Sequence, residues 1–576
     1  MSIGKYSEHL GNLTETVNHI LHKIEEEKII SRIWQHDYTV WKEKPDEISN
    51  RLDWLHAPEN MVPHIPTIYS FVEEIRSEKF KHAVLLGMGG SSLAPEVFQK
   101  IFGVKPGFIN LAVLDSTHPA IISEYFTRYQ PEETLYIVST KSGGTVETIS
   151  LMKYFYTNVK KVLGMAQVAK HFIAITDPGS GLEEMARQLN FRKIFLNNPN
   201  IGGRYSALTY FGLVPAALLG INLDRLLHNA REMSQSCKIS EFVSGTENPA
   251  ARLGAVMAGA AEKGRDKITF LLSPSLKPFA AWNEQLIAES TGKEGKGILP
   301  VLDAKIMKMD HYSSDRWFTF FRLGQDEHLV RLISKMKKTS HPFIEIQLND
   351  VYNLGAEFFR WEMATAIAGW SLKINPFDQP NVESSKILAR KMVESYRTTR
   401  KLPPMNPAMR AGNLHIYTFT PGRTLKEILL NYFQPERDAS EKAVLPAYIS
   451  IHAYLHPHPQ LDIILQKLQD TFAKKYKVPV TLGYGPRFLH STGQLHKGDS
   501  GKGIFIQLSA DIDQDLPIPD RIGEDQSTIS FETLITSQYL GDFQALHDNG
   551  RRILRIHLGK KPLIELKKFI KIINSL

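Results

Sequence analysis

The chain has 576 residues, of which 42% are hydrophobic and 23% charged, and its formal net charge is +8. This composition is typical of a soluble globular protein, and the length predicts two to four domains. No apolar run approaches the roughly 18 residues of a membrane span, and the first residues lack the pattern of a signal peptide. Cys237 is the only cysteine, which excludes an intrachain disulfide and a cysteine-based zinc cluster. We expect a cytoplasmic protein with no membrane partner.

The excess of positive charge suits an anionic partner. The 69 basic residues are nevertheless scattered along the chain and form no basic stripe with interleaved aromatic side chains. A nucleic-acid partner is therefore not expected. A small phosphorylated ligand fits the charge equally well.

The first third of the chain predicts a helical region followed by a sheet. Residues 1–80 read as mostly helical, with a proline-marked break. Residues 82–102 and 134–156 each combine a buried strand, a glycine-rich turn and a helix, and further strands are predicted at 111–116, 171–178 and 193–198. Strands with intervening helices predict a doubly wound parallel α/β sheet. Ligands of such a sheet bind at the carboxyl ends of its strands, where the two glycine-rich turns lie.

A second unit of the same kind is predicted after about residue 249. Its strands are expected at 267–273, 317–323 and 342–348, and a long helix follows at 354–371. Residues 393–440 contain a PP pair, a turn and a helix near 424–433, and read as a connector.

The order of the second unit then recurs. The strands expected at 447–455, 502–508 and 551–558 match those of the second unit in apolar pattern, and the helix at 459–476 matches the one around 278–290. This recurrence predicts an internal repeat. We divide the chain into five segments, which are 1–80, 81–248, 249–392, 393–440 and 441–576.

Two polar turns are candidates for binding an anion. In STKSGGTVET (139–148), hydroxyls crowd a turn between a strand and a helix, where free backbone N–H groups favour phosphate. An ordinary helix N-cap is the simpler interpretation, but capping needs only one such hydroxyl. GMGGSS (87–92) is a weaker signal, because a bare tight turn explains it equally well.

Three further motifs carry charged side chains that suit catalysis. Arg204 in NIGGRYS follows two glycines and precedes an apolar helix, so its planar cation is a candidate for stabilising an oxyanion. Gln285 and Glu289 lie four residues apart on one helical face, which makes Glu289 a candidate general base. Lys386 lies two helical turns beyond Gln379. Each motif also has a simpler interpretation. Arg204 could be a surface arginine, Lys386 could be an ordinary exposed lysine, and Glu284 and Glu294 are competing carboxylates for the role of base.

In their order and spacing, these motifs resemble the phosphoglucose isomerase family, which is built from sugar-isomerase (SIS) domains. GGRYS (202–206) and FDQ-x-x-VE-x-x-K (377–386) are specific to that family, and the resemblance covers roughly residues 82–390. The C-terminal GYGPRFLHSTGQLHKG resembles the isomerase half of bifunctional transaldolase/phosphoglucose isomerases, although no transaldolase portion is visible. The resemblance implies an α/β fold of doubly wound, three-layer (α/β/α) SIS domains with a C-terminal SIS-like repeat.

The resemblance also implies roles for individual residues. The phosphate-binding set would be Ser91, Thr140, Lys141, Ser142 and Thr145. Glu289 would be the base, Gln285 its neighbouring glutamine, and Arg204 the cation that steadies the enediol. Gln379 and Lys386 would belong to the closing motif, whose lysine helps to open the sugar ring, and Gly90 would line the substrate site. No metal and no cofactor are implied.

The ring-opening histidine is displaced in this chain. Many bacterial family members carry it in LHS-x-GQ about twenty residues after the base, whereas here that interval reads MDHYSSDRW, with His311, and LHSTGQ stands at 489–494. In the family this histidine comes from the neighbouring subunit of a dimer. If the C-terminal repeat replaces that subunit, His490 would complete the site and the protein would be a monomer. The alternatives are His311 as the ring opener and LHSTGQ as a structural loop, and we interpret His496 as a surface residue.

The function implied is the reversible isomerisation of glucose 6-phosphate and fructose 6-phosphate through a cis-enediol. An isomerase that also accepts mannose 6-phosphate, a sugar-phosphate sensor without catalysis, and a subunit that works with a separate transaldolase are the alternatives. The presence of Glu289, Arg204 and Lys386 argues against the sensor.

Overall fold

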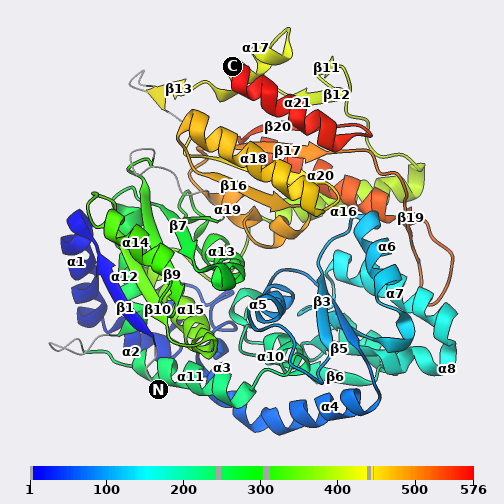
Figure 1. Ribbon diagram of the computed structural model, residues 1–576, viewed down its shortest axis with the longest axis horizontal. Helices are drawn as coiled ribbons and strands as arrows, with labels where there is room; N and C mark the ends of the chain where they lie inside the picture. The colour runs from blue at the N-terminus through cyan, green and yellow to red at the C-terminus, as the bar shows by residue number, and fades with distance from the viewer. Residues whose placement is uncertain (1–3, 242–247, 303–311, 438–442, 445) are drawn as a thin grey trace.

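The computed structural model describes residues 4–241, 248–302, 312–437, 443–444 and 446–576. Three sheets with mainly parallel strands, each flanked by helices, make up the molecule (Figure 1). The predicted α/β fold class with doubly wound parallel sheets is therefore confirmed. Among the described residues, no helix has both the length and the apolar character needed to cross a membrane.

The first sheet has five parallel strands and a switch point beside both polar turns. In spatial order its strands are β3 (Asn110–Leu114), β2 (His82–Gly87), β4 (Thr134–Ser139), β5 (Phe172–Thr176) and β6 (Lys193–Leu196). From β2 the chain moves outward to β3, and from β4 it moves outward in the other direction. The turns that follow β2 and β4 therefore lie together at the point where ligands of such sheets bind.

Helices cover both faces of the first sheet. Alternate residues of a strand point to opposite faces, and in β2 Ala83 and Leu85 join one apolar cluster while Val84 and Leu86 join another. The first cluster includes residues of α5 (Leu93–Phe102) and α10 (Tyr210–Leu218), and the second includes residues of α6 (Pro119–Arg128), α7 (Val146–Leu163) and α9 (Gly181–Gln188). This is the three-layer arrangement that the resemblance implies.

The second sheet begins with a strand from the N-terminal segment. Its order is β1 (Lys5–His9), β10 (Phe343–Leu348), β9 (Arg316–Leu323), β7 (Lys267–Leu272) and β8 (Leu299–Val301). The strand β1 pairs antiparallel with β10, and the other pairs are parallel. We predicted residues 1–80 as mostly helical, and the short β1 was missed because its partner lies over 330 residues away. The helices of this unit are α12 (Pro249–Glu262), α13 (Lys277–Thr291), α14 (Glu327–Met336) and α15 (Leu354–Ser371).

The third sheet repeats the strand order of the second. Its order is β11 (Met409–Ala411), β12 (Leu414–Thr418), β20 (Arg552–His557), β17 (Gly503–Ser509), β15 (Tyr448–Tyr454) and β16 (Val480–Tyr484). The parallel strands β20, β17, β15 and β16 correspond to β10, β9, β7 and β8, and each series has an antiparallel strand beside its edge. Part of the predicted connector thus belongs to this sheet, because β12 pairs with β20. The residue limits of the five segments stay predictions.

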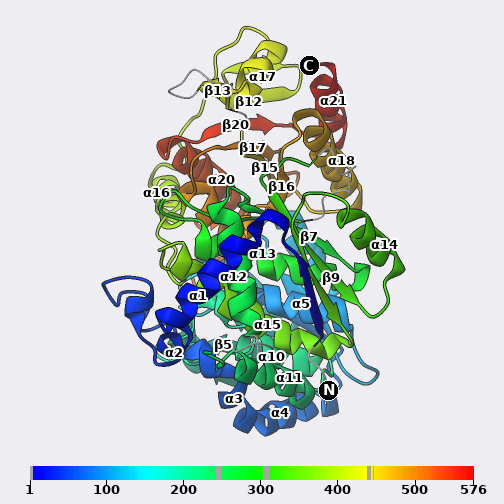
Figure 2. The same cartoon turned by 90° about the vertical axis from the view of Figure 1, so that its left-hand side faces the viewer.

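The third sheet lies against the other two units. Figures 1 and 2 both place α18 (Pro459–Tyr476) and α21 (Pro562–Ser575) beyond the first and second sheets, with α16 (Glu383–Thr399) and α20 (Phe531–Asp548) between. The helices α16 and α20 cross closely, since a Cβ on Gly541 would lie 2.9 Å from the backbone nitrogen of Ala389. This close packing joins the C-terminal unit to the rest of the chain.

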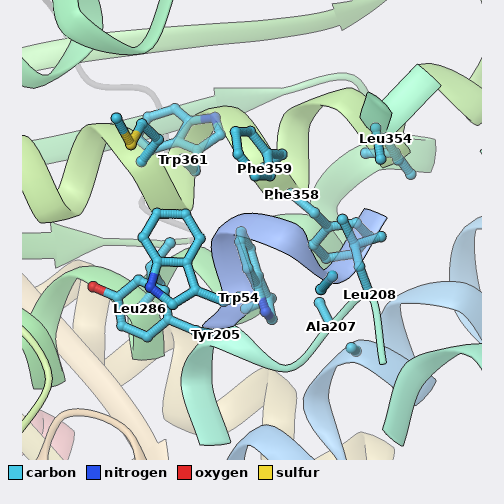
Figure 3. Packing of buried hydrophobic residues seen from close by; sticks show 14 of the residues in the cluster. Trp54, Tyr205, Ala207, Leu208, Leu286, Leu354, Phe358, Phe359 and Trp361 are labelled. Carbon is cyan, nitrogen blue, oxygen red and sulfur yellow. The ribbon is translucent and has the colours of Figure 1, made fainter. Parts of the chain in front are cut away.

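An aromatic cluster fixes the region around Arg204. The ring of Tyr205 packs on that of Trp54 with a centroid distance of 5.2 Å, and Trp54 packs on Phe359 at 5.7 Å (Figure 3). Trp361 and Trp54 are both fully buried, and removal of one such ring typically costs about 3–5 kcal/mol. The N-terminal segment, the GGRYS loop and α15 are thereby held together.

Candidate active site

The turn after β4 presents hydroxyl groups at the start of α7. Thr145 is the residue that precedes α7, and its Oγ1 lies 3.1 Å from Oγ1 of Thr140. The Ser142 hydroxyl accepts a hydrogen bond from the Gly144 backbone N–H at 3.3 Å. Gly143 has φ +69°, and a Cβ there would lie 2.3 Å from the Leu182 nitrogen, so the turn requires glycine. Hydroxyls at a helix N-terminus are suited to a phosphate group.

Arg204 is a buried cation with fixed partners. It lies in a short 3-10 turn, and its side chain is only 3% exposed. Its guanidinium donates to the Ser290 hydroxyl at 2.8 Å, to the Gln379 side-chain oxygen at 3.0 Å, and to two backbone carbonyls of the 376–378 loop. A guanidinium held from several sides cannot move away from charge that develops near it.

Glu289 lies between this cation and Gln285. A Glu289 oxygen, Oε1, is 3.3 Å from Nη1 of Arg204, and Oε2 accepts a hydrogen bond from Nε2 of Gln285 at 3.1 Å. Both Gln285 and Glu289 belong to α13, where the four-residue spacing places them on one face. The carboxylate is 14% exposed, so it is accessible at one side only.

The glycine turn after β2 packs closely against the GGRYS loop and Gln285. A Cβ on Gly90 would lie 1.9 Å from the Gly203 carbonyl oxygen, and one on Gly89 would lie 2.9 Å from Nε2 of Gln285. Neither contact is possible for another residue without movement of the backbone or of Gln285. The two turns therefore approach Arg204 and Gln285 because they consist of glycines.

The C-terminal segment 487–498 is built into this region. The Gln285 Nε2 donates to the backbone carbonyl of His490 at 2.7 Å. Gln494 accepts hydrogen bonds from the backbone N–H groups of Asn381 and Val382, at 2.8 and 3.1 Å, and donates to the Gly292 carbonyl at 3.0 Å. The LHSTGQ motif thus connects the end of α13 with the loop that receives Arg204.

A pocket of about 710 Å³ is lined by residues from three units, with His490 among them but not Arg204, Gln285 or Glu289. Ser142 and Thr145 come from the first sheet, Lys386 from α16, and His490 from the C-terminal unit. Nε2 of His490 lies 3.0 Å from Oε1 of Glu147, which also accepts a hydrogen bond from Gln538 at 2.8 Å. The imidazole is therefore oriented by a buried carboxylate at the start of α7.

Two buried groups near the site have shifted pKa values. Burial alone would raise the pKa of the Glu147 carboxyl, but the charge and hydrogen bond of His490, with the charge of Lys386, lower it below its ordinary value. Burial and the Arg204 charge lower the pKa of the Lys293 ammonium to about 8, although its ion pair with Asp378 at 2.6 Å opposes this shift. Glu147 is thus ionised at neutral pH beside the imidazole of His490.

Comparisons with known proteins identify the family. A model of the family described as phosphoglucose isomerase matches residues 65–306. The glucose-6-phosphate isomerase of Carboxydothermus hydrogenoformans is 33% identical over 393 residues, which span 58% of this chain and 83% of that protein. The chain belongs to the phosphoglucose isomerase family.

A second relative agrees with this assignment, and two solved structures share the fold. The glucose-6-phosphate isomerase of Campylobacter jejuni is 27% identical over 398 residues, 61% of this chain and 94% of that protein. The crystal structure of a glucose-6-phosphate isomerase from Chlamydia trachomatis superposes with a TM-score of 0.56 at 18% identity, covering 66% of this chain and 86% of that one. The hypothetical protein TT0462 from Thermus thermophilus gives 0.54 at 23% identity, covering 67% and 100%. These two structures support the SIS fold, and the family makes the protein an isomerase.

The structure brings most of the predicted residues of this isomerase together. Arg204, Gln285, Glu289 and Gln379 form one hydrogen-bonded group, and His490 joins it through its carbonyl. Ser142, Thr145, Lys386 and His490 line the pocket of about 710 Å³. Ser91 and Thr140 are buried in the two turns that flank the switch point, and Gly90 lies against Gly203. His311 lies outside the described residues.

The predicted role of Lys141 in phosphate binding stays a prediction, and in this structure its ammonium pairs with Asp177 and donates to the Pro199 carbonyl. His496 is not a surface residue, because it is 1% exposed and its Nε2 lies 3.3 Å from the Ser450 hydroxyl. It belongs to a buried polar group with His452, Lys497 and Asp542, in which Nζ of Lys497 lies 2.7 Å from the Asp542 carboxylate. The sequence around His496 is polar, and only packing against the third sheet explains its burial.

Sequence reasoning missed three residues that shape the site of this phosphoglucose isomerase relative. Glu147 had a signal, because a carboxylate in the first turn of α7 is unexpected beside an anion-binding turn. Gln494 was noticed only as part of a motif, and its partners at 292 and 381–382 are distant in sequence. Lys293 gave no signal, because a lysine after a helix usually lies in solvent.

Proposed function

We propose that this protein interconverts glucose 6-phosphate and fructose 6-phosphate through a cis-enediol intermediate. The observation that carries the proposal is the Glu289 carboxylate, held between the Arg204 guanidinium and the Gln285 amide next to the glycine turn after β2. The printed names of the relatives, glucose-6-phosphate isomerases, support this choice of substrate. A base, a fixed cation and an anion-binding turn are the groups that proton transfer next to a carbonyl requires.

In this proposal, Ser142 and Thr145 with the start of α7 hold the phosphate. Glu289 removes the proton from C2 of the aldose, and the electron pair moves toward the carbonyl oxygen O1. Arg204 stabilises the negative charge that develops on the oxygens. The proton returns from Glu289 to C1, and the hydroxyl proton passes from O2 to O1, so that the ketose forms with no net change in atoms. The reverse direction begins at C1 of the ketose.

Ring opening is assigned to His490 and Lys386, which line the same pocket. A protonated imidazole beside the ionised Glu147 can give a proton to the ring oxygen, and the Glu147 contact at 3.0 Å fixes its orientation. Lys386 contributes positive charge at the pocket wall. A separate transaldolase partner and tolerance of mannose 6-phosphate are the alternatives, and the latter is tested by offering that sugar in the same assay.

The proposal is tested by coupling glucose 6-phosphate formation to NADP reduction, with fructose 6-phosphate as the substrate and EDTA in excess. We expect wild-type activity to survive EDTA and Glu289→Gln to lower kcat by about 10²–10⁴-fold, because the amide cannot accept the proton. Glu294→Gln is the matched control, since Glu294 pairs with Lys42 at the surface and should keep its activity. Wild-type protein without turnover, or Glu289→Gln with normal turnover, would contradict the proposal.

The role of His490 is tested separately. An analogue of fructose 6-phosphate without the 5-hydroxyl cannot close the furanose ring and needs no ring opening. We expect His490→Ala to slow turnover of fructose 6-phosphate by about 10²-fold or more while changing turnover of the open analogue little. Glu147→Gln should also slow turnover of fructose 6-phosphate, but by less, because the Glu147 carboxylate only orients the imidazole. Equal losses on both substrates would remove His490 from ring opening.

A further inference from the structure

Lys293 is a buried cation beside the loop that receives Arg204. It follows Gly292, the residue at which α13 ends, and its side chain is only 1% exposed. The residue does not line the pocket around His490, so we do not expect it to touch the sugar phosphate. Lysine is rarely buried to this extent unless its charge is paired, and the partner that it has here belongs to the candidate site.

The ammonium of Lys293 and the guanidinium of Arg204 share one acceptor. Nζ of Lys293 donates to the backbone carbonyl of Asp378 at 2.6 Å and to its carboxylate, also at 2.6 Å. Nη2 of Arg204 donates to the same carbonyl at 2.9 Å, and its Nη1 donates to the Gln379 side chain at 3.0 Å. The loop 376–379 therefore receives both cations, and Lys293 holds the part of the loop that contacts Arg204.

The C-terminal unit fixes the backbone of Lys293. A Cβ on Gly498 would lie 2.9 Å from the Lys293 Cα, so the two backbones are in close contact. Gln494 donates to the Gly292 carbonyl at 3.0 Å and accepts from the backbone N–H of Asn381 at 2.8 Å. Because both ends of the lysine side chain are fixed, its ammonium restrains the loop and does not follow it.

The charge of Lys293 also balances the group around the base. This group contains two carboxylates, Glu289 and Asp378, and two cations, Arg204 and Lys293. Without the ammonium, the group would carry a net negative charge close to the enediol oxygens on which the proposed reaction develops another. Burial and the Arg204 charge lower the pKa of the ammonium to about 8, whereas the charge and hydrogen bond of Asp378, with the charge of Glu289, oppose this shift.

We propose that Lys293 is a positioning residue of the candidate active site, which holds the loop 376–379 against Arg204 and balances the charge of the group in the transition state. The second part of this inference rests on the proposed isomerase function, whereas the first part can be measured without turnover. The protonated form is needed, because hydrogen bonds from a charged donor are roughly twice as strong as neutral ones. We therefore expect kcat/KM to fall as Lys293 loses its proton.

The first test is hydrogen–deuterium exchange of the full chain, measured by mass spectrometry. We expect Lys293→Met to raise exchange of the backbone N–H groups in residues 376–382 about tenfold, because the loop loses the hydrogen bonds that restrain it. Lys296→Met is the matched control, since Lys296 lies in the same connection but donates to the Leu372 carbonyl, and its exchange in 376–382 should equal that of wild type. Equal exchange in all three proteins would overturn the positioning role, whether or not the protein is an isomerase.

The second test is the pH dependence of kcat/KM for fructose 6-phosphate. In wild type we expect an alkaline decline near pH 8, because the ammonium is present below that pH and lost above it. Asp378→Asn removes a charge that favours the ammonium but keeps an acceptor oxygen, so the decline should move to lower pH by about one unit. Lys293→Met should lower kcat by about 10²-fold with a smaller change in KM and should lack the decline, whereas Lys296→Met should keep the wild-type profile.

The two tests separate this inference from the function on which part of it rests. Wild-type protein without turnover would count against the proposed function, and exchange in the loop would still decide the positioning role. An active Lys293→Met with the wild-type pH profile would show that the ammonium has no part in the reaction. Loss of activity in Lys293→Met, with a decline that stays near pH 8 in Asp378→Asn, would leave Lys293 only a structural role and overturn the charge argument.

Discussion

At the scale of single residues, the site depends on glycines as much as on charged side chains. Arg204 and Glu289 meet because the backbone after β2 passes close to the GGRYS loop, and Gly90 permits this approach. Gly90 brings the backbone of this turn against that of the GGRYS loop, beside the group formed by Arg204, Gln285 and Glu289.

Gly90→Ala should therefore inactivate the enzyme. A Cβ 1.9 Å from the Gly203 carbonyl forces the two turns apart, so we expect kcat/KM for fructose 6-phosphate to fall by about 10²-fold, as for a misplacement of about 1 Å. Gly181→Ala is the matched control, because the nearest atom to its Cβ would be 3.7 Å away. Circular dichroism checks that both variants fold, and a fully active Gly90→Ala would refute the steric argument.

At the scale of elements, the segment 487–498 is held to the first unit by charge as well as by hydrogen bonds. Arg487 pairs with Glu96 of α5, and its Nη1 lies 3.1 Å from the Asp115 carboxylate. Burial alone would raise the pKa of Glu96, but the Arg487 guanidinium beside it, with Lys100, lowers that pKa from 4.5 to about 2. The pair thus links the segment that carries His490 to the first sheet.

This pair predicts a loss of stability in acid. Because the pKa of Glu96 is lower in the folded state, its contribution is complete above about pH 4.5 and is lost as the pH falls toward about 2. In urea unfolding between about pH 5 and pH 3, we expect the free energy of unfolding to fall less steeply for Glu96→Gln than for wild type. Glu327→Gln, at an exposed helix position, should follow the wild-type slope. Parallel slopes for Glu96→Gln and wild type would contradict the assignment.

At the scale of the whole molecule, residues from three units of one chain surround the candidate site. The third sheet repeats the strand order of the second, and its unit supplies His490 and Gln494. This arrangement supports the prediction that the repeat takes the place of a second subunit. The site would then be complete within a monomer.

A monomeric enzyme should keep its activity on dilution. We expect the activity per chain to stay constant from micromolar to nanomolar concentration, because dissociation of a dimer cannot remove a residue of the same chain. Sedimentation velocity over the same range should give one species near the chain mass of 65.3 kDa. Activity that falls on dilution together with a dimer peak would show that a second chain contributes.

The sequence by itself determined the elements and the family. Alternating strands and helices, the two glycine turns and the spacing of Gln285 and Glu289 are local patterns, because strand and helix periodicity depend on neighbouring residues. The family motifs predicted catalytic roles for Arg204, Lys386 and His490 before any contact was known. The recurrence of apolar patterns was enough to predict the third sheet.

Only the tertiary structure decided which of these residues meet. The pairing of β1 with β10, the contact of Glu147 with His490 and the hydrogen bonds of Gln494 each join residues more than 100 positions apart. The ion pair of Lys141 with Asp177 and the burial of His496 also arise from contacts between distant elements. The physical reason is that side-chain environment depends on packing between elements, whereas sequence patterns report mainly on the element in which they occur.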